Sequence, residues 1–109
     1  MAKGRKVFAS KKDATHDEIA RRFRELGCSV VETNLPPVPG FPDLIVGCIG
    51  ENHLVEAKNL GTDYGRKGFN ANQSAFNRDW RGEPVELATC ADDASALVQK
   101  WRARAKVKR

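Results

Sequence analysis

The 109-residue sequence lacks several features that mark particular classes of protein. No apolar run approaches the roughly 18 residues of a membrane-spanning helix, and no apolar stretch follows the lysine-rich start, so we expect an intracellular, cytoplasmic protein without anchor or signal peptide. The three cysteines, Cys28, Cys48 and Cys90, have no short paired spacing. This excludes a disulfide framework and a zinc knuckle, and we interpret the cysteines as reduced core residues.

The sequence also has too few acidic residues to balance its basic ones, which leaves a net charge of +5. The basic residues gather at both ends and in one glycine-rich loop, where they could bind phosphates by neutralising charge and releasing counterions. In that loop Tyr64 and Phe69 could stack on bases or pack back on the loop. A basic tail kept for solubility explains the same charge. The residues expected to bind DNA are Lys11, Lys12, Tyr64, Arg66, Lys67, Arg104 and Lys106.

The length allows a single domain. We expect residues 1–12 to form a flexible basic arm, residues 13–104 the folded domain and residues 105–109 a basic tail. Apolar spacing and turn residues predict an α/β fold of the order α-β-β-β-α-β-α, a central mixed sheet flanked by helices. The expected elements are a helix at 15–26, strands at 29–33, 43–49 and 53–58, a helix at 72–81, a strand at 84–89 and a last helix from Asp92.

Helical spacing also predicts which side chains point inward. Thr15 and Glu18 have the form of a capping box that opens the first helix. In the second helix Gln73, Phe76 and Trp80 share one face, which we expect to point inward. The core stripe expected in the last helix is Ala94, Leu97, Val98 and Trp101.

Charged residues on the predicted hairpin need an explanation. Side chains alternate along a strand, so Glu56 and Lys58 share a face. A four-residue turn at 49–52 would put Asp43 opposite Lys58 and diagonal to Glu56. Because close carboxylates repel and burial disfavours their charge, the pair predicts a divalent cation such as Mg²⁺, with Lys58 beside it to position water or stabilise charge on an attacked phosphate. The alternative is a Glu-Lys pair on a solvated strand face.

These residues resemble a known motif. Pro42-Asp43 and Glu56-Ala57-Lys58 are similar to the signature of the PD-(D/E)xK nucleases. The surrounding pattern resembles the virus-type replication-repair nuclease domain, called VRR-NUC, from about Ile19 to Trp101. That pattern consists of Gly40-Phe41-Pro42-Asp43-Leu44-Ile45, the step from Asp43 to Glu56, a helical Glu upstream and Gln73 downstream. The resemblance implies a restriction-endonuclease-like fold and DNA cleavage that depends on Mg²⁺ or Mn²⁺.

The resemblance also implies roles by position. Asp43, Glu56 and the Ala57 carbonyl would bind the metal, and Lys58 would act on the attacking water. Glu18 would reach the metal through water, although it could instead cap its helix. Gln73 matches the glutamine that begins the following helix, and its partner would be either the active site or a strand backbone.

The two histidines have no partner at ligand spacing, so we interpret His16 and His53 as structural or solvated. His53 falls on the strand face opposite Glu56.

Small stand-alone proteins of this kind, such as those of phages, resemble Holliday-junction resolvases of DNA recombination and repair. The resemblance therefore implies a homodimer that cuts four-way junctions in the cytoplasm of a phage-infected or lysogenic bacterial host. Two alternatives stay open. One is a nuclease acting on flaps, nicks or duplex DNA, and the other is a non-catalytic basic module that binds nucleic acid.

Overall fold

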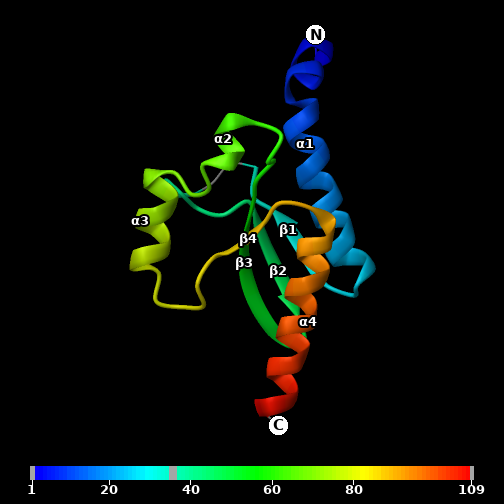
Figure 1. Cartoon of the computed structure of the whole chain (residues 1–109), viewed down its shortest axis with the longest axis vertical. Coiled ribbons are helices and arrows are strands. Elements are labelled where there is room, and N and C mark those ends of the chain that lie inside the picture. The colour runs from blue at the N-terminus through cyan, green and yellow to red at the C-terminus, as the bar shows by residue number, and fades with distance from the viewer. Residues whose placement is uncertain (1, 35–36, 109) are drawn as a thin grey trace.

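The computed structural model describes the backbone of residues 2–34 and 37–108, and the side chains of residues 14–34, 37–63 and 65–107. Figure 1 shows the elements in space. In chain order they are α1 (Ala2–Glu25), β1 (Ser29–Glu32), β2 (Leu44–Cys48), β3 (Glu51–Ala57), α2 (Asp63–Arg66), α3 (Ala71–Asp79), β4 (Glu86–Ala88) and α4 (Ala91–Lys108). The predicted order is confirmed, with the short α2 added in the glycine-rich loop.

The first helix is longer than the sequence predicts. It begins at Ala2 rather than near residue 15, so residues 2–12, expected as a flexible arm, form its first turns. This segment has no proline and consists largely of alanine, lysine and arginine, which are good helix formers. Thr15 therefore lies inside the helix and cannot be its N-cap. The predicted basic tail likewise continues α4 as far as Lys108.

The four strands form one mixed sheet in the order β1-β2-β3-β4. β1 pairs with β2 and β2 with β3 in antiparallel fashion, whereas β3 and β4 are parallel. Parallel neighbours require a long crossover connection, and here the crossover carries α2 and α3. The mixed sheet flanked by helices is thus confirmed.

The hairpin turn differs from the predicted one. Its two residues are Ile49 and Gly50, with φ of 56° and 76°, and Cys48 pairs with Glu51. Two successive positive φ values match the hairpin turn whose twist fits that of the flanking strands, although a β-branched residue adopts this conformation at a cost. The predicted four-residue turn is therefore wrong. The change moves the partner of each β2 residue by two positions, which keeps every side chain on its predicted face.

The main core lies between the sheet and a layer of two helices, α1 and α4, which run side by side in Figure 1. Trp101 of α4 is completely buried, with its ring 5.8 Å from Phe23 of α1 and 3.8 Å from His53 of β3. The structural interpretation of His53 is therefore confirmed. Cys90 is exposed, because it precedes α4 instead of facing the core, and this corrects its prediction. The core contains Ile19, Ala20, Phe23, Cys28, Leu44, Val46, Cys48, Val55, Ala57, Ala88, Ala94, Leu97, Val98 and Trp101.

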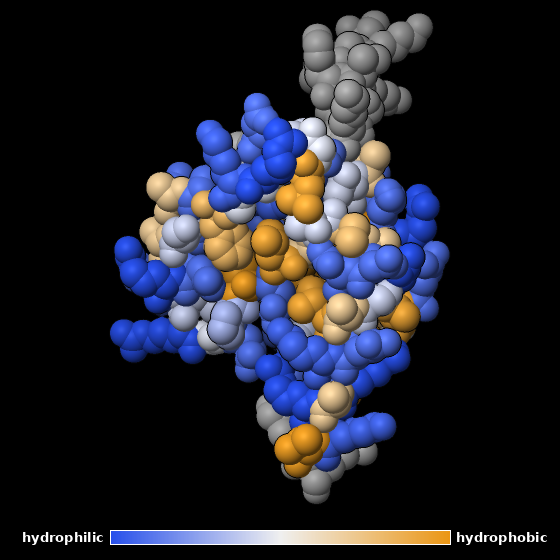
Figure 2. All heavy atoms as spheres, viewed as in Figure 1, coloured by the Kyte–Doolittle hydropathy of each residue, from blue (hydrophilic) through white to orange (hydrophobic). Residues whose placement is uncertain are grey.

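The other face of the sheet has a lighter cover. It meets α3, which contains no buried residue. Figure 2 shows apolar atoms gathered between α3 and α4 and surrounded by hydrophilic side chains. Within the described residues, no helix has the length and apolar character needed to cross a membrane.

Candidate active site

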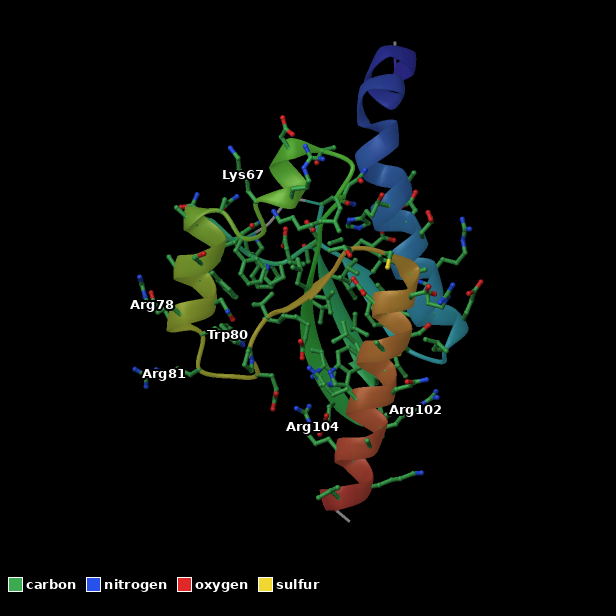
Figure 3. The ribbon with its side chains drawn as sticks, in the orientation of Figure 1. Lys67, Arg78, Trp80, Arg81, Arg102 and Arg104 are labelled. Atoms are coloured by element: carbon green, nitrogen blue, oxygen red, sulfur yellow. The ribbon has the colours of Figure 1, made fainter. Side chains whose placement is uncertain are left out.

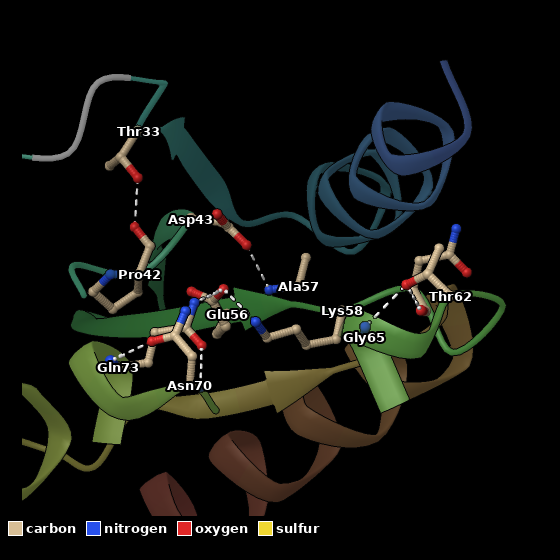
Figure 4. Close-up of polar contacts among 11 residues, drawn as sticks. Thr33, Pro42, Asp43, Glu56, Ala57, Lys58, Thr62, Gly65, Asn70 and Gln73 are labelled. Carbon is tan, nitrogen blue, oxygen red and sulfur yellow. Dashed lines mark hydrogen bonds and ion pairs between the residues drawn. The ribbon is translucent and has the colours of Figure 1, made fainter. Parts of the chain in front are cut away.

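The hairpin, the α2 loop and α3 meet around a cavity of about 350 Å³. Figure 4 shows the polar contacts beside it, and most of the predicted catalytic residues line it. The lining residues are Thr15, His16, Asp43, Glu56, Ala57, Lys58, Asn59, Thr62, Gly65 and Gln73. The site therefore combines residues from α1, from the hairpin and from the crossover.

Asp43 is held from two sides. Its backbone carbonyl accepts a hydrogen bond of 2.8 Å from the Thr33 amide. Its carboxylate Oδ2 accepts one of 3.0 Å from the Ala57 amide. Leu44 pairs with Val55, so the register puts Asp43 directly opposite Glu56, where Cβ atoms of paired residues lie about 5 Å apart. The two carboxylates thus meet more closely than the predicted diagonal arrangement allows.

Glu56 is a buried carboxylate with one oxygen left over. Only 4% of its surface is exposed. Its Oε2 accepts a 2.7 Å hydrogen bond from the Gln73 side chain and lies 3.6 Å from Lys58 Nζ. Its Oε1 is buried and has no hydrogen-bond partner among the described residues. A buried acceptor without a donor is costly, so this oxygen points to a ligand.

Lys58 is as deeply buried as Glu56, with 3% of its surface exposed. Its backbone amide donates to the Ala88 carbonyl over 3.0 Å, which extends the ladder between β3 and β4 past the end of the strand. The alternative of a solvated Glu-Lys pair is therefore wrong. Charged groups are rarely buried unless they are paired or functional.

Gln73 links α3 to the Glu56 carboxylate, and both the oxygen and the nitrogen of its side-chain amide form hydrogen bonds. Asn70 is the N-cap of α3, and its side-chain Oδ1 accepts a 2.9 Å hydrogen bond from the backbone amide of Gln73. Gln73 Oε1 in turn accepts from the Asn70 amide over 2.9 Å. Since Oε1 faces a donor, Nε2 must face Glu56, so the helix cap fixes the amide in the orientation that the carboxylate needs. The sequence allows two partners for Gln73, the active site and a strand backbone. The structure shows the first, because the side chain donates to Glu56 of the candidate site.

The approach of α3 requires a glycine in the loop before β2. Gly40 has a φ of 80°, and a Cβ on it would lie 2.2 Å from the Asn72 carbonyl oxygen. Such contacts do not occur, so only glycine lets the loop that ends in Asp43 pass against the start of α3.

Glu18 is not brought to the site. It is exposed on α1 and does not line the cavity, whereas Thr15 and His16 do. Glu18 follows Thr15 by three residues and so lies near it on the helix, but its side chain is exposed and stays outside the cavity. The capping alternative for Glu18 fails as well, because Thr15 lies inside the helix. His16, interpreted from the sequence as structural or solvated, lies on the cavity wall with Nε2 3.1 Å from Glu32 Oε1.

Comparison with known proteins addresses the fold. The sequence matches no protein-family model and has no significant match among curated proteins. The structure is similar to a solved structure described as a VRR_NUC domain, with a TM-score of 0.63 and 22% identity over 82% of this chain and 95% of that chain. This chain has the VRR-NUC fold. The fold predicted from the motif is thereby confirmed.

The VRR-NUC fold of this chain presents a donor set that suits a hard divalent cation. Asp43 and Glu56 lie opposite each other in the cavity, and the unsatisfied Glu56 Oε1 is free to bind an ion. Within the described residues, no group of three or more His, Cys, Asp or Glu side chains could hold a metal ion. The groups that could contact an ion here are the Asp43 and Glu56 carboxylates and the Ala57 carbonyl, and waters would have to complete its shell.

The residues predicted to bind DNA differ in how far they are exposed on the VRR-NUC fold. The side chains of Lys11, Lys12 and Tyr64 lie outside the described residues. Arg104 joins Glu51 and Glu83, each over 3.2 Å, so it ties α4 to the sheet. The remaining three, Arg66, Lys67 and Lys106, are exposed, and Arg66 is paired with Asp63.

The environment of Glu56 predicts how stability depends on pH. Burial and then repulsion from Asp43 raise the pKa of Glu56 from 4.5 to about 7, against an opposing effect of Lys58. Because the pKa of Glu56 is higher in the folded state than in the unfolded state, its protonation stabilises the fold. This contribution is fully present below pH 4.5 and is lost as the pH rises through 7. In a chelating buffer, urea denaturation should show a loss on the order of 3 kcal/mol from pH 4.5 to 8. Glu56→Gln should remove most of this slope, and an unchanged slope would contradict the assignment.

Proposed function

We propose that this chain is a metal-dependent DNA endonuclease that hydrolyses phosphodiester bonds. The observation that carries the proposal is the buried carboxylate pair of Asp43 and Glu56, with an unsatisfied oxygen, next to a buried lysine in an open cavity. A pair of this kind destabilises the metal-free fold, so a ligand is the reason to keep it. The similarity in fold to a VRR_NUC domain supports the same reaction class.

The residues of the site divide the chemistry between them. Asp43, Glu56 and the Ala57 carbonyl would hold Mg²⁺ or Mn²⁺. When bound, such an ion lowers the pKa of a coordinated water and polarises the phosphate. Lys58 would donate to the attacking water or to the phosphate oxygen on which charge develops. Gln73 would keep the Glu56 carboxylate in place. Water adds to phosphorus as the bond to the 3′ oxygen breaks, which leaves a 5′-phosphate and a protonated 3′-hydroxyl.

We further propose that the substrate is branched DNA and that two copies of the chain resolve a four-way junction. Resolution needs two cuts related by two-fold symmetry, whereas the described residues of one chain supply one carboxylate site of this kind. A symmetric dimer presents two such sites at a fixed spacing. Phosphate contacts and shape would then select the branch, with little readout of base edges.

The test compares a labelled four-way junction with a linear duplex of the same sequences, each incubated with Mg²⁺, Mn²⁺ or EDTA. We expect metal-dependent paired cuts on the junction and no cuts in EDTA. Cutting of the duplex as well would keep the nuclease but remove the junction preference. Binding without cleavage under every metal condition would replace the proposal with a non-catalytic nucleic-acid-binding module.

A further inference from the structure

The aromatic side chains of α3 do not form the inward stripe that the sequence predicts. Phe76 packs edge-on against Phe41, with ring centroids 5.4 Å apart, and Trp80 stacks on Phe76 at 5.2 Å. The row ends at the surface, because 44% of Trp80 is exposed. Phe41 lies two residues before Asp43, so the row runs from the loop that leads into the site to an exposed indole. One face of that indole covers Phe76, and Gly82 approaches the indole at its Nε1, where a Cβ on Gly82 would lie 2.8 Å away. The absence of a side chain at Gly82 keeps the rest of the ring accessible to a further flat ring.

The charges around Trp80 favour an anionic partner. Arg78 forms two hydrogen bonds with Asp79, of 2.9 and 3.0 Å, and Glu83 is paired with Arg104. The nearby acids are thus each neutralised by an arginine. Arg81 forms no ion pair with any side chain that the structure describes, and the same holds for Lys67. Figure 3 shows Lys67 near the start of α3, with Arg78 and Arg81 reaching outward at its end.

The distance from the cavity fits a short stretch of nucleic acid. Trp80 follows Gln73 by seven residues, and a helix rises about 1.5 Å per residue, so the indole lies about 10 Å along α3 from the amide that holds Glu56. A strand in duplex DNA advances about 3.4 Å per nucleotide, and an unpaired strand extends further, so this separation corresponds to about three nucleotides or fewer.

We propose that Trp80 is a stacking platform for an unpaired base of the DNA substrate, with the phosphate beside that base held by Arg81 and the strand then passing Lys67 at the other end of α3 (Figure 3). The inference rests on the proposed nuclease function and extends its substrates from the fully paired four-way junction to branched DNA with unpaired nucleotides within about three positions of the cut bond. Base stacking on an exposed aromatic residue, beside a basic track, is the usual way of holding single strands without reading their sequence.

The test measures binding in EDTA, so that its result does not depend on cleavage. The probes are a blunt labelled duplex and the same duplex with a single-stranded thymidine flap. We expect the wild-type protein to prefer the flapped probe and Trp80→Ala to weaken flap binding about tenfold, the size of one lost base stack, with little effect on the blunt duplex. Trp80→Phe should retain most of the affinity, because phenylalanine still stacks.

Two further measurements make the result specific. The flap should quench the fluorescence of exposed Trp80, and this quenching should disappear in Trp80→Phe, where only the buried Trp101 remains. Arg81→Ala should weaken flap binding more than Arg102→Ala, which removes the same charge from α4. An unchanged flap preference in Trp80→Ala would overturn the proposal even if the wild-type enzyme cuts DNA. Loss of self-association alone in that variant would overturn it too and assign the indole to a second copy of the chain.

Lost flap binding in Trp80→Ala would support the platform even if the wild-type protein cut no DNA. In that case the nuclease proposal fails and the platform stands. The two proposals can therefore be separated in one set of experiments.

Discussion

Glu56→Gln will lower the rate of metal-dependent DNA cleavage by about a thousandfold or more, equivalent to about 4 kcal/mol in the activation free energy. The change removes the charge on the one carboxylate that has an unsatisfied buried oxygen among the residues that the structure describes, while an amide of the same shape can still contact Gln73 and Lys58. Binding of DNA in EDTA should stay within about twofold, since most of its affinity comes from basic residues elsewhere. Single-turnover cleavage of a labelled junction gives the measurement.

Glu18→Gln is the matched control for that experiment. It makes the same chemical change at the acidic residue that the sequence pattern assigns to the metal through water. Because Glu18 is exposed on α1 and does not line the cavity, we expect cleavage within about twofold of wild type. A large loss in Glu18→Gln, or normal cleavage by Glu56→Gln, would show that the site has been placed wrongly.

Trp101→Ala will lower the free energy of unfolding by about 3–5 kcal/mol, a large part of the stability of a small domain. The indole is fully buried between Phe23 and His53, so its removal leaves a cavity between α1, α4 and the sheet. Burial also lowers the pKa of His53, which keeps this stacking partner neutral near pH 7. Urea denaturation followed by circular dichroism measures the loss.

Two variants serve as controls for Trp101. Trp101→Phe keeps one aromatic ring in the stack but removes the rest of the indole, including a nitrogen that has no described hydrogen-bond partner, so it leaves a smaller cavity and should cost clearly less than Trp101→Ala. Trp80→Ala removes the exposed indole and should cost about 1 kcal/mol or less. Equal losses at positions 80 and 101 would contradict the described division between core and surface.

Local patterns made the strands and the carboxylate face predictable. Alternation fixed Glu56 and Lys58 on one side of β3 and His53 on the other, and a register change of two residues does not disturb that assignment. The turn itself was missed, because an isoleucine with positive φ has no signal in sequence rules that expect glycine or asparagine there. The register, and with it the direct pairing of Asp43 and Glu56, therefore needed the structure.

Helix positions were harder to predict, since they depend on where a helix begins and on what covers it. The pattern at Thr15 resembles a cap, but the helix begins at Ala2, so Thr15 cannot cap it, and Glu18 is exposed outside the cavity. The real cap of α3, Asn70 with Gln73, has the same signature and was visible in the sequence. Trp80 was expected inside because spacing alone does not show that α3 covers only part of its sheet face.

The light cover that α3 provides has a consequence for heat resistance. Its contribution to the site is the Gln73 contact with Glu56, and it contains no buried residue, whereas α1 and α4 share a continuous core. On warming, α3 can therefore detach while the rest of the domain stays folded. The proposed activity would be lost before the domain unfolds, and adaptation to a hotter environment would act first on the contact between α3 and the loop before β2, where Gly40 meets the first turn of α3.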